Sequence, residues 1–260
     1  MKEKLIDLLF KYKNAFATDK EPVGAIIVQE VGIMLNVEKA YPALLRRPAY
    51  PASPRASEAL EVEVTTPVII TWRIGKSRMV GDHRALSTYT IADRYPIPRI
   101  HETLTQASQA KLITAMDSLK GFHQNVFTDN SKRLLRIIPH CGTFEYPRMP
   151  FGIKNAPSHY QRMMKTIFPE ELSEGWLIIY MDDIIVCSAT WVSHLTRLER
   201  VLQKIVKVNI EISLKKCHFS YSELKALGHF ISGLSLGIEK KVAAVLLKPI
   251  PQTKKEMKLF

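Results

Sequence analysis

The sequence predicts an α+β fold in which an antiparallel sheet is backed by helices. Short apolar runs rich in β-branched residues are interspersed with amphipathic segments of helical period. The polar stretches that separate the central apolar runs are short enough for hairpin turns. With 260 residues, 46% of them hydrophobic, the chain can bury a substantial core as one large or two small domains.

The first part of the chain contains a predicted helix, a proline-rich arm and the first strands. Residues 2–16 place Leu5, Leu8 and Leu9 on one apolar face, which predicts an amphipathic helix. Residues 41–54 hold four Pro among Arg residues, and because repeated Pro excludes a helix, an extended basic arm is expected. Residues 62–70 are predicted as one or two strands and residues 98–107 as a helix.

The second part of the chain supplies most of the expected sheet and its covering helices. Asn155 is a candidate N-cap for a helix that has Pro157 in its first turn and runs to about residue 168. The other expected elements are a strand at 111–116 leading into Asp117, a hairpin at 134–148 around Cys141 and Gly142, a helix at 191–208 with one apolar stripe, and strands near 211–214 and 224–232.

The most informative segment sets two adjacent carboxylates inside an apolar run. Residues 177–180 and 184–186 are predicted as two short buried strands, which places Asp182 and Asp183 at the tip of a hairpin. Neighbouring carboxylates raise each other's pKa unless a divalent cation binds both. Hard oxygen ligands favour Mg²⁺ or Mn²⁺. The alternative is a solvated Asp-Asp turn, since Asp is common in turns.

The charge of the chain indicates a polyanionic partner. The formal net charge is +12, and residues 200–260 hold twelve Lys or Arg against four Asp or Glu. A solvated basic face is the alternative interpretation of that charge alone. Beside a metal-binding carboxylate hairpin, the phosphates of a nucleic acid are the better explanation.

The cysteines and the apolar runs indicate a reducing, intracellular compartment. Cys141, Cys187 and Cys217 are odd in number and lack paired metal-ligand spacing, so neither a disulfide framework nor a zinc site is predicted. No signal peptide is visible at the start of the chain. The most apolar stretch is broken by the Asp pair, so no membrane partner is expected.

Tyr180-Met181-Asp182-Asp183 matches the Tyr-X-Asp-Asp box of reverse transcriptases, and the surrounding chain resembles the polymerase of gypsy-class LTR retrotransposons. Six blocks follow that family's order and spacing between Thr65 and about Lys255. They lie at residues 81–87, 93–100, 117–124, 149–157, 180–183 and 226–229. The resemblance implies the right-hand polymerase fold, in which fingers and palm interleave along the chain.

The resemblance implies a location inside the cell, in the cytoplasm, in a retrotransposon particle or in the nucleus. It also implies a division of the chain into parts. Its parts are an N-terminal helical segment (1–40), an extended basic arm and reduced fingers (41–110), the first part of the palm (111–126), a fingers hairpin (127–150), the palm with the catalytic hairpin and the primer grip (151–235), and the start of a thumb or connection (236–260).

By resemblance, the chain is an RNA-directed DNA polymerase that uses two Mg²⁺ or Mn²⁺ ions, deoxynucleoside triphosphates and a primed RNA or DNA template. Asp117 and Asp182 are then the principal metal ligands, the Ser118 carbonyl assists, and Asp183 lies nearer the primer end. Lys216 is the candidate for protonating the leaving pyrophosphate. The alternatives are a strand-terminating Asp117 and a solvated Lys216.

The same resemblance implies a nucleotide pocket and a primer grip. Phe122 matches the aromatic residue under the incoming sugar, where its ring would collide with a 2′-hydroxyl; the alternative is a core Phe. Gly152 permits close backbone approach, and Arg side chains make bidentate phosphate contacts. The expected nucleotide-binding residues are Arg73, Arg78, Gly121, Phe122, Phe151, Gly152 and Met181, with Lys76 a weaker candidate, and the expected primer-grip residues are Leu227, Gly228 and His229.

The chain departs from the family pattern in the fingers. A helix and a strand that the family carries between residues 57–60 and 62–67 are missing, and His83, Ser87 and Ser77 replace the usual aromatic residue, Asn and Trp. With a chain that stops at Phe260, these departures predict a truncated copy. Two functions therefore stay open: an active polymerase, or an impaired relic that binds nucleic acid. A two-metal phosphoesterase is disfavoured because no His-Asp ligand pattern is present.

Overall fold

The computed structural model describes residues 2–17, 24–35, 65–73, 76–100, 102, 105, 110–137, 144–232 and 235–237. The basic arm expected at 41–54 lies outside these residues, as do the position of the expected fingers deletion and the chain after residue 237. Within the helix expected at 98–107, helical backbone is described at Ile100, Glu102 and Thr105.

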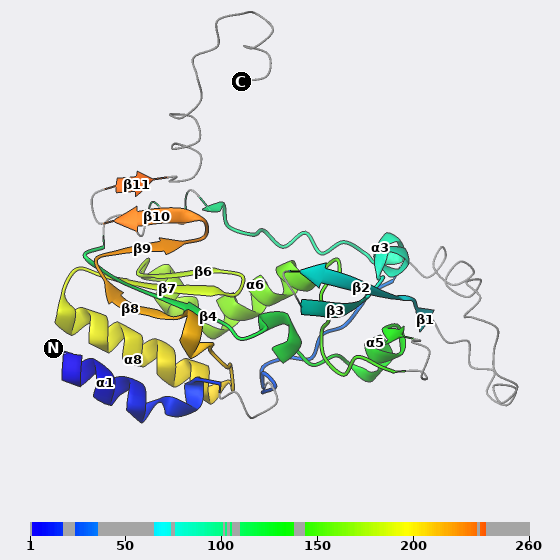
Figure 1. Ribbon diagram of the computed structural model, residues 1–260, viewed down its shortest axis with the longest axis horizontal. Helices are drawn as coiled ribbons and strands as arrows, with labels where there is room; N and C mark the ends of the chain where they lie inside the picture. Colours follow the sequence, from blue (N-terminus) through cyan, green and yellow to red (C-terminus); the bar gives the residue numbers. More distant parts are fainter. Residues whose placement is uncertain are drawn as a thin grey trace, which may run out of the picture.

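A four-stranded antiparallel sheet forms the centre of the molecule (Figure 1). Its strands follow the order β6-β7-β4-β8, and every neighbouring pair is antiparallel. The strands are β6 (Leu177–Tyr180), β7 (Asp183–Ser188), β4 (Leu112–Asp117) and β8 (His218–Tyr221). The predicted α+β fold with an antiparallel sheet backed by helices is confirmed.

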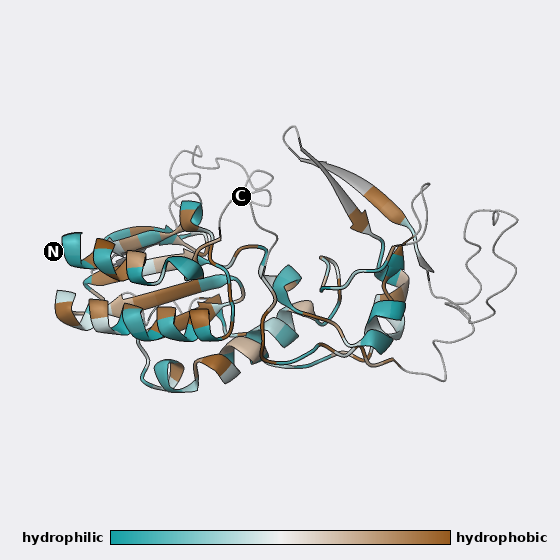
Figure 2. Ribbon diagram, turned by 90° about the horizontal axis from the view of Figure 1, so that it is seen from below, coloured by the Kyte–Doolittle hydropathy of each residue, from teal (hydrophilic) through white to brown (hydrophobic). Residues whose placement is uncertain are grey.

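Both faces of this sheet are buried, which explains why β6 and β7 are almost continuously apolar. Ile179 and Ile184 belong to the core on the helical side of the sheet. Ile178 and Ile185 belong to a second core, which they share with Leu224 on the opposite side. Figure 2, viewed from below Figure 1, shows a hydrophobic strand between helices of mixed hydropathy.

Helices α1 (Lys2–Lys11) and α8 (Trp191–Lys207) lie side by side under the sheet (Figure 1). The helix predicted at 191–208 is confirmed, and Thr190 caps it by accepting a hydrogen bond from the backbone N–H of Ser193 (3.3 Å). Its fully buried apolar stripe comprises Leu198, Val201, Leu202 and Ile205.

The expected continuation of the first helix to Phe16 is wrong. α1 ends at Lys11, and a 3₁₀ turn over Lys13–Ala15 follows it. Phe16 instead forms a parallel β-bridge with Ile212, because the Ala17 N–H donates to the Ile212 carbonyl and the Ile212 N–H donates to the Ala15 carbonyl. A pairing partner far along the chain therefore ends this helix.

Helix α6 (Ala156–Ile167) begins where the sequence predicts, with Pro157 in its first turn. Asn155 stands at the N-cap position, but its side chain makes no cap hydrogen bond, which corrects the expected role. Its amide instead donates to the Ile91 carbonyl (2.7 Å) and accepts from the Asp93 N–H (3.0 Å). Asn155 thereby fixes an extended segment against the start of α6.

The strand expected near 211–214 is wrong, and β8 follows it without having been predicted. Ile212 forms only isolated bridges, to Phe16 and Ser118, and the chain then turns through a 3₁₀ helix, η3 (Leu214–Lys216). The strand expected at 224–232 is two strands, β9 (Glu223–Ala226) and β10 (His229–Ser232), and β11 (Ser235–Gly237) pairs with β10.

The remaining described elements lie outside the central four-stranded sheet. Part of the strand expected at 62–70 is described as β1 and β2, and the hairpin expected at 134–148 is described only as β5 and a bridge between Ile137 and Phe144. These elements are β1 (Thr65–Thr66), β2 (Val68–Arg73), β3 (Lys76–Gly81), α3 (Arg84–Tyr89), η2 (Gly121–Gln124), α5 (Asp129–Arg133), β5 (Arg136–Ile137) and α7 (Pro169–Ser173).

Cys187 and Cys217 are free thiols, and Cys141 lies outside the described residues. Burial raises the pKa of Cys187 to about 12 and that of Cys217 to about 11. Both thiols are therefore protonated and unreactive near neutral pH. No helix in the described part of the chain is long and apolar enough to cross a membrane.

Candidate active site

The turn between β6 and β7 holds the adjacent carboxylates. Tyr180 and Asp183 are register partners, and Met181 has a positive φ of 50° in the turn between them. Gln161 of α6 fixes this turn, since its amide accepts from the Met181 N–H (2.9 Å) and donates to the Ile179 carbonyl (2.9 Å). Nothing in the local sequence marks Gln161 for this role, because only the tertiary structure brings α6 against the hairpin.

Asp117 lies at the same end of the sheet as the hairpin carboxylates. It is the last residue of β4 and the register partner of Asp183 on β7. The next residue, Ser118, donates its backbone N–H to the Asp182 carbonyl (2.9 Å). The antiparallel pairing of β4 with β7 therefore brings three carboxylates together from two distant parts of the chain.

The electrostatics of this cluster disfavour three ionised carboxylates. Burial, followed by the charges of Asp117 and Asp183, raises the pKa of Asp182 to about 6. Burial and the charge of Asp117 also raise the pKa of Asp183. Asp182 Oδ1 is buried and has no hydrogen-bond partner in the described part of the chain. A buried oxygen without a partner calls for an explanation, and a bound cation would supply one.

Lys216 supplies the positive charge next to this cluster. Its Nζ lies 2.9 Å from Asp117 Oδ1 and 3.1 Å from Oδ2. The backbone sets this position, because the Ser213 N–H donates to the Asp117 carbonyl (2.9 Å) directly before η3 begins.

Among the described residues, no group of three His, Cys, Asp or Glu side chains is arranged as a formed metal site.

Gly121 is needed for close packing behind Asp182. A Cβ at this position would overlap Asp182 Oδ1 and would lie 3.0 Å from Tyr160 Oη. Tyr160 is fully buried on α6, so its ring has little room to move away from an added Cβ. The structure thus explains a glycine that the sequence analysis placed only by resemblance.

Aromatic rings form the floor beside the carboxylates. Phe122 meets the rings of Phe151 and Tyr160 edge-on, with centroids 6.1 and 5.7 Å apart. His123, which the sequence analysis did not select, lies 4.7 Å from the Phe151 ring. Burial and the charges of nearby Lys and Arg side chains lower the pKa of His123, so the ring is neutral at pH 7. Gly152 has a φ of 92°, which requires glycine.

Gln124 connects this floor to the segment that carries Lys216. Its amide is fully buried and donates to the Leu119 carbonyl (2.8 Å) and the Glu211 carbonyl (3.0 Å). It also accepts from the Glu211 N–H (2.8 Å). A buried amide with all of its hydrogen bonds made within the protein is typical of a residue that fixes two segments together. The sequence analysis missed this role.

Comparison with known proteins identifies the family of this site. A model of the family described as "Reverse transcriptase (RNA-dependent DNA polymerase)" matches residues 67–231. The chain belongs to this reverse transcriptase family. The predicted resemblance to gypsy-class retrotransposon polymerases is confirmed, because the similar curated proteins are retrotransposon Pol polyproteins.

Two of these relatives show how much of such a polyprotein the reverse transcriptase chain covers. It is 37% identical over 186 residues to the Pol polyprotein from transposon 297 of Drosophila melanogaster, which is 71% of this chain and 18% of that protein. It is 32% identical over 187 residues to the Tf2-3 polyprotein of Schizosaccharomyces pombe, which is 72% of this chain and 14% of that protein. The chain therefore spans less than a fifth of these relatives.

Solved structures support the fold of this reverse transcriptase domain. The foamy viral protease-reverse transcriptase in complex with an RNA/DNA hybrid matches with a TM-score of 0.78 and 21% identity. The match covers 99% of this chain and 36% of that chain. The predicted right-hand polymerase fold is confirmed by this similarity.

Strands β2 and β3 form an antiparallel hairpin in the stretch where the family resemblance predicts the fingers hairpin. Thr71 pairs with Arg78 and Arg73 pairs with Lys76, so both predicted triphosphate-binding Arg residues lie on this hairpin. Their side chains lie outside the described part of the structure. Contact between these Arg side chains and a triphosphate therefore stays a prediction.

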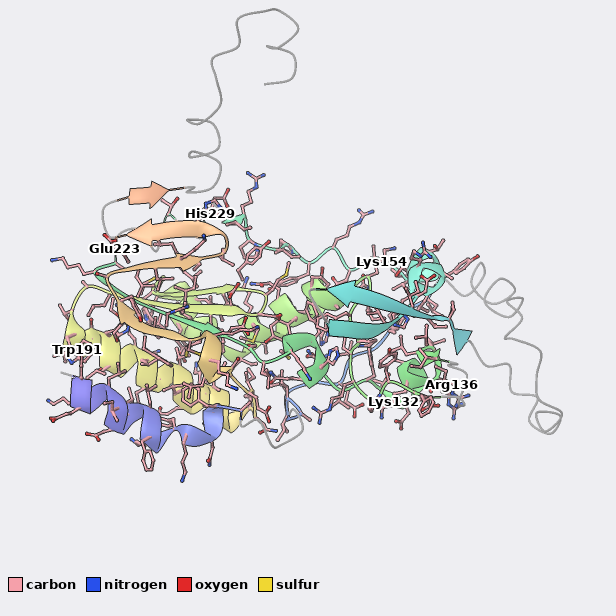
Figure 3. The ribbon with its side chains drawn as sticks, in the orientation of Figure 1. Lys132, Arg136, Lys154, Trp191, Glu223 and His229 are labelled. Carbon is pink, nitrogen blue, oxygen red and sulfur yellow. The ribbon has the colours of Figure 1, made fainter. Side chains whose placement is uncertain are left out.

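The expected primer grip is a tight turn between β9 and β10. Ala226 pairs with His229, and the two residues between them have positive φ values, 53° at Leu227 and 77° at Gly228. Figure 3 shows His229 beside this turn and Glu223 at the far end of the hairpin. The turn is confirmed, and its contact with a primer stays a prediction.

Proposed function

We propose that this domain is an RNA-directed DNA polymerase that extends a primer with deoxynucleoside triphosphates. The observation that carries the proposal is the register pairing of Asp117 with Asp183, with Asp182 beside them at the hairpin tip. Three acidic groups at one end of a buried sheet are costly unless they bind cations. Membership of the reverse transcriptase family makes nucleotidyl transfer the reaction that this cluster supports best.

The residues of this cluster fit Mg²⁺ or Mn²⁺. Asp117, Asp182 and Asp183 would hold two ions with the Ser118 carbonyl, and the partnerless buried Oδ1 of Asp182 supports this assignment. Their hard oxygen donors suit such ions. When bound, the ions make the primer 3′-hydroxyl nucleophilic and stabilise the leaving pyrophosphate.

The other site residues orient the substrates and handle the proton. The Phe122 ring, braced by Phe151 and Tyr160, would exclude a ribose 2′-hydroxyl. Arg73 and Arg78 would bind the triphosphate from the fingers hairpin. Gly121, Gly152 and Met181 would shape the pocket through the backbone. Lys216 is placed next to the carboxylates, where it can give a proton to the pyrophosphate.

We also propose a primed RNA or DNA template as the partner of this domain. The foamy viral neighbours were solved with an RNA/DNA hybrid and with double-stranded DNA. The net charge of +12 suits such polyanions. Lys132 and Arg136 project near α5, and Lys154 lies near α3, at the end of the molecule opposite Trp191 (Figure 3). Leu227, Gly228 and His229 would hold the primer end.

A primer-extension assay tests the polymerase. Purified chain is incubated with poly(rA)/oligo(dT), thymidine triphosphate and Mg²⁺ or Mn²⁺, with Asp182→Asn as the inactive control. Metal-dependent extension by the wild-type chain alone is the expected result. Equal product from both proteins would show that the synthesis comes from a contaminant and would contradict the proposal.

A second candidate function is nucleic-acid binding without synthesis. His83, which replaces an aromatic residue of the family, is buried with no hydrogen-bond partner for either ring nitrogen in the described part of the chain. Such a group destabilises the border of the fingers and favours an impaired relic. This function predicts salt-sensitive primer-template binding with undetectable synthesis, improved by grafting the missing helix and strand between Leu60 and Val62. Robust synthesis at micromolar nucleotide would exclude it.

A further inference from the structure

We propose that Lys216 is an internal counter-cation that competes with divalent ions for Asp117, so that the free domain binds metal weakly. The inference rests on the proposed metal site and adds a resident competitor to it. In the metal-free state, the ammonium group neutralises one carboxylate of the cluster. A divalent ion binds Asp117 more tightly once Lys216 has moved away.

The contact itself supports competition for the same atoms. Lys216 Nζ lies within hydrogen-bond distance of both carboxylate oxygens of Asp117, at 2.9 and 3.1 Å. These two oxygens are the only side-chain atoms that Asp117 can offer to a metal ion. Each of them therefore faces the ammonium group, and the positive charge of that group opposes the binding of a metal ion to either oxygen.

The surroundings make Lys216 a removable partner. Its side chain is 62% exposed, whereas that of Asp117 is 24% exposed. An exposed ammonium group regains hydration when it leaves, so the ion pair is weak enough to be displaced. A fully buried Lys would instead block the site.

The backbone keeps the displaced Lys216 close to the site. The Ser213 N–H donates to the Asp117 carbonyl, and the Lys216 N–H donates to the Ser213 carbonyl, each at 2.9 Å. Cys217 Sγ also donates to the Ser213 carbonyl (3.2 Å). The turn that carries Lys216 is therefore anchored to the backbone of Asp117. It stays there when the Lys216 side chain leaves the Asp117 carboxylate. The freed ammonium group stays beside the carboxylates, where the pyrophosphate departs in the proposed reaction.

Asp117 and Asp182 differ in whether their carboxylate oxygens have a partner. Asp182 Oδ1 is buried without a partner, and no three-residue metal group is formed among the residues that the structure describes. The cluster thus has an unpartnered carboxylate oxygen at Asp182 and an engaged carboxylate at Asp117. Metal affinity in the absence of substrates should therefore depend on the strength of the Lys216 contact.

The test measures Mn²⁺ affinity of the full chain without nucleic acid or nucleotide. Free Mn²⁺ is followed by electron paramagnetic resonance during titration of the wild type, K216Q, K216R, K215Q and D117N. Lys215→Gln is the matched control, because it removes the same charge from the neighbouring position. Circular dichroism melting of each variant establishes that it is folded.

We expect K216Q to bind Mn²⁺ about three- to fivefold more tightly than the wild type, because this corresponds to the upper end of the strength of an exposed ion pair. K215Q should stay within about twofold of the wild type, because Lys216 keeps its contact with Asp117 in this variant and charge at the surface is screened by salt. K216R should also stay close to the wild type. D117N should lose the binding.

Two outcomes overturn the inference, and they separate it from the proposed function. Equal affinity of K216Q and K215Q, with binding still lost in D117N, leaves the metal site in place and removes the competition. Affinity that is the same in wild type, D117N and K216Q shows that Mn²⁺ does not use Asp117, which removes both the inference and the proposed metal site.

Discussion

Thr114 and His194 are hydrogen-bonded through Oγ1 and Nε2 (2.8 Å), between the central strand β4 and helix α8. Both residues are fully buried. Thr114 Oγ1 also accepts from the Ser220 N–H (2.9 Å), where the pairing of β4 with β8 shifts register. His194 Nδ1 has no partner in the described part of the chain, and burial lowers the pKa of His194 to about 4.

This pair predicts that the contribution of His194 to the stability of the domain falls on acidification. The raised pKa values of Asp182 and Asp183 act in the opposite direction, because the folded state binds protons there more readily than the unfolded state does. The pKa of His194 is about 4 when folded and about 6.5 when unfolded, so the unfolded chain binds more protons between these values. The contribution of His194 to the free energy of unfolding should therefore fall as pH decreases from about 6.5 to 4, by at most about 3 kcal/mol. Urea unfolding at pH 7.5, 6 and 5 measures the change.

His194→Gln is the control for that experiment, because the amide can still reach Thr114 and does not titrate. His83, His123 and His159 also have pKa values lowered by burial, so some pH dependence should remain in this variant. A pH dependence identical to that of the wild type would show that His194 is not the titrating group.

Asp182→Asn should abolish primer extension and preserve template binding. The amide keeps the shape of the carboxylate but removes a charge from the proposed metal site, so the rate should fall by roughly 10²- to 10³-fold or more. Phosphate contacts by Lys and Arg supply most non-specific affinity, so binding should change little. Fluorescence anisotropy of a labelled primer-template separates the two effects, and parallel loss of both would indicate misfolding.

Gly121→Ala should impair both stability and synthesis. The added methyl group overlaps Asp182 Oδ1 and crowds Tyr160 Oη, so the carboxylate must shift, at a cost of about 1–3 kcal/mol in the free energy of unfolding. Gly32→Ala is the matched control, because a Cβ at Gly32 meets no atom within 4 Å. Chemical denaturation and primer extension check both variants, and equal behaviour would disprove the close contact.

Phe122→Val should relax the choice of sugar. Without the ring between the incoming nucleotide and Tyr160, we expect ribonucleotide use to rise relative to deoxynucleotide use, on the order of tenfold. The ratio of kcat/KM for the two triphosphates is the measurement. Loosened packing would lower both values together, so an unchanged ratio in an active variant would remove Phe122 from the pocket.

The local pattern of the sequence was sufficient to predict the central features of this domain. The hairpin carrying Asp182 and Asp183 and helix α8 lie where the sequence predicts them, because apolar period, turn residues and caps act between neighbouring residues. Asp117 was placed at a strand end for the same reason. The order of motifs along the chain then led to the reverse transcriptase family.

Partners from distant parts of the chain decided the rest. The first helix ends early because Phe16 pairs with Ile212, and Asn155 binds the backbone of residues 91 and 93 instead of capping its helix. Neither partner is visible in the local sequence.

The contacts that shape the site have the same origin. Gln161 fixes the turn between β6 and β7, Gln124 connects residues 119 and 211, and Lys216 engages both oxygens of Asp117. The side chains of Gln and Lys can form hydrogen bonds with many different partners. The residue type alone therefore does not predict which partner each of them binds. The antiparallel pairing of β4 with β7, and the segments that fold against it, make that selection.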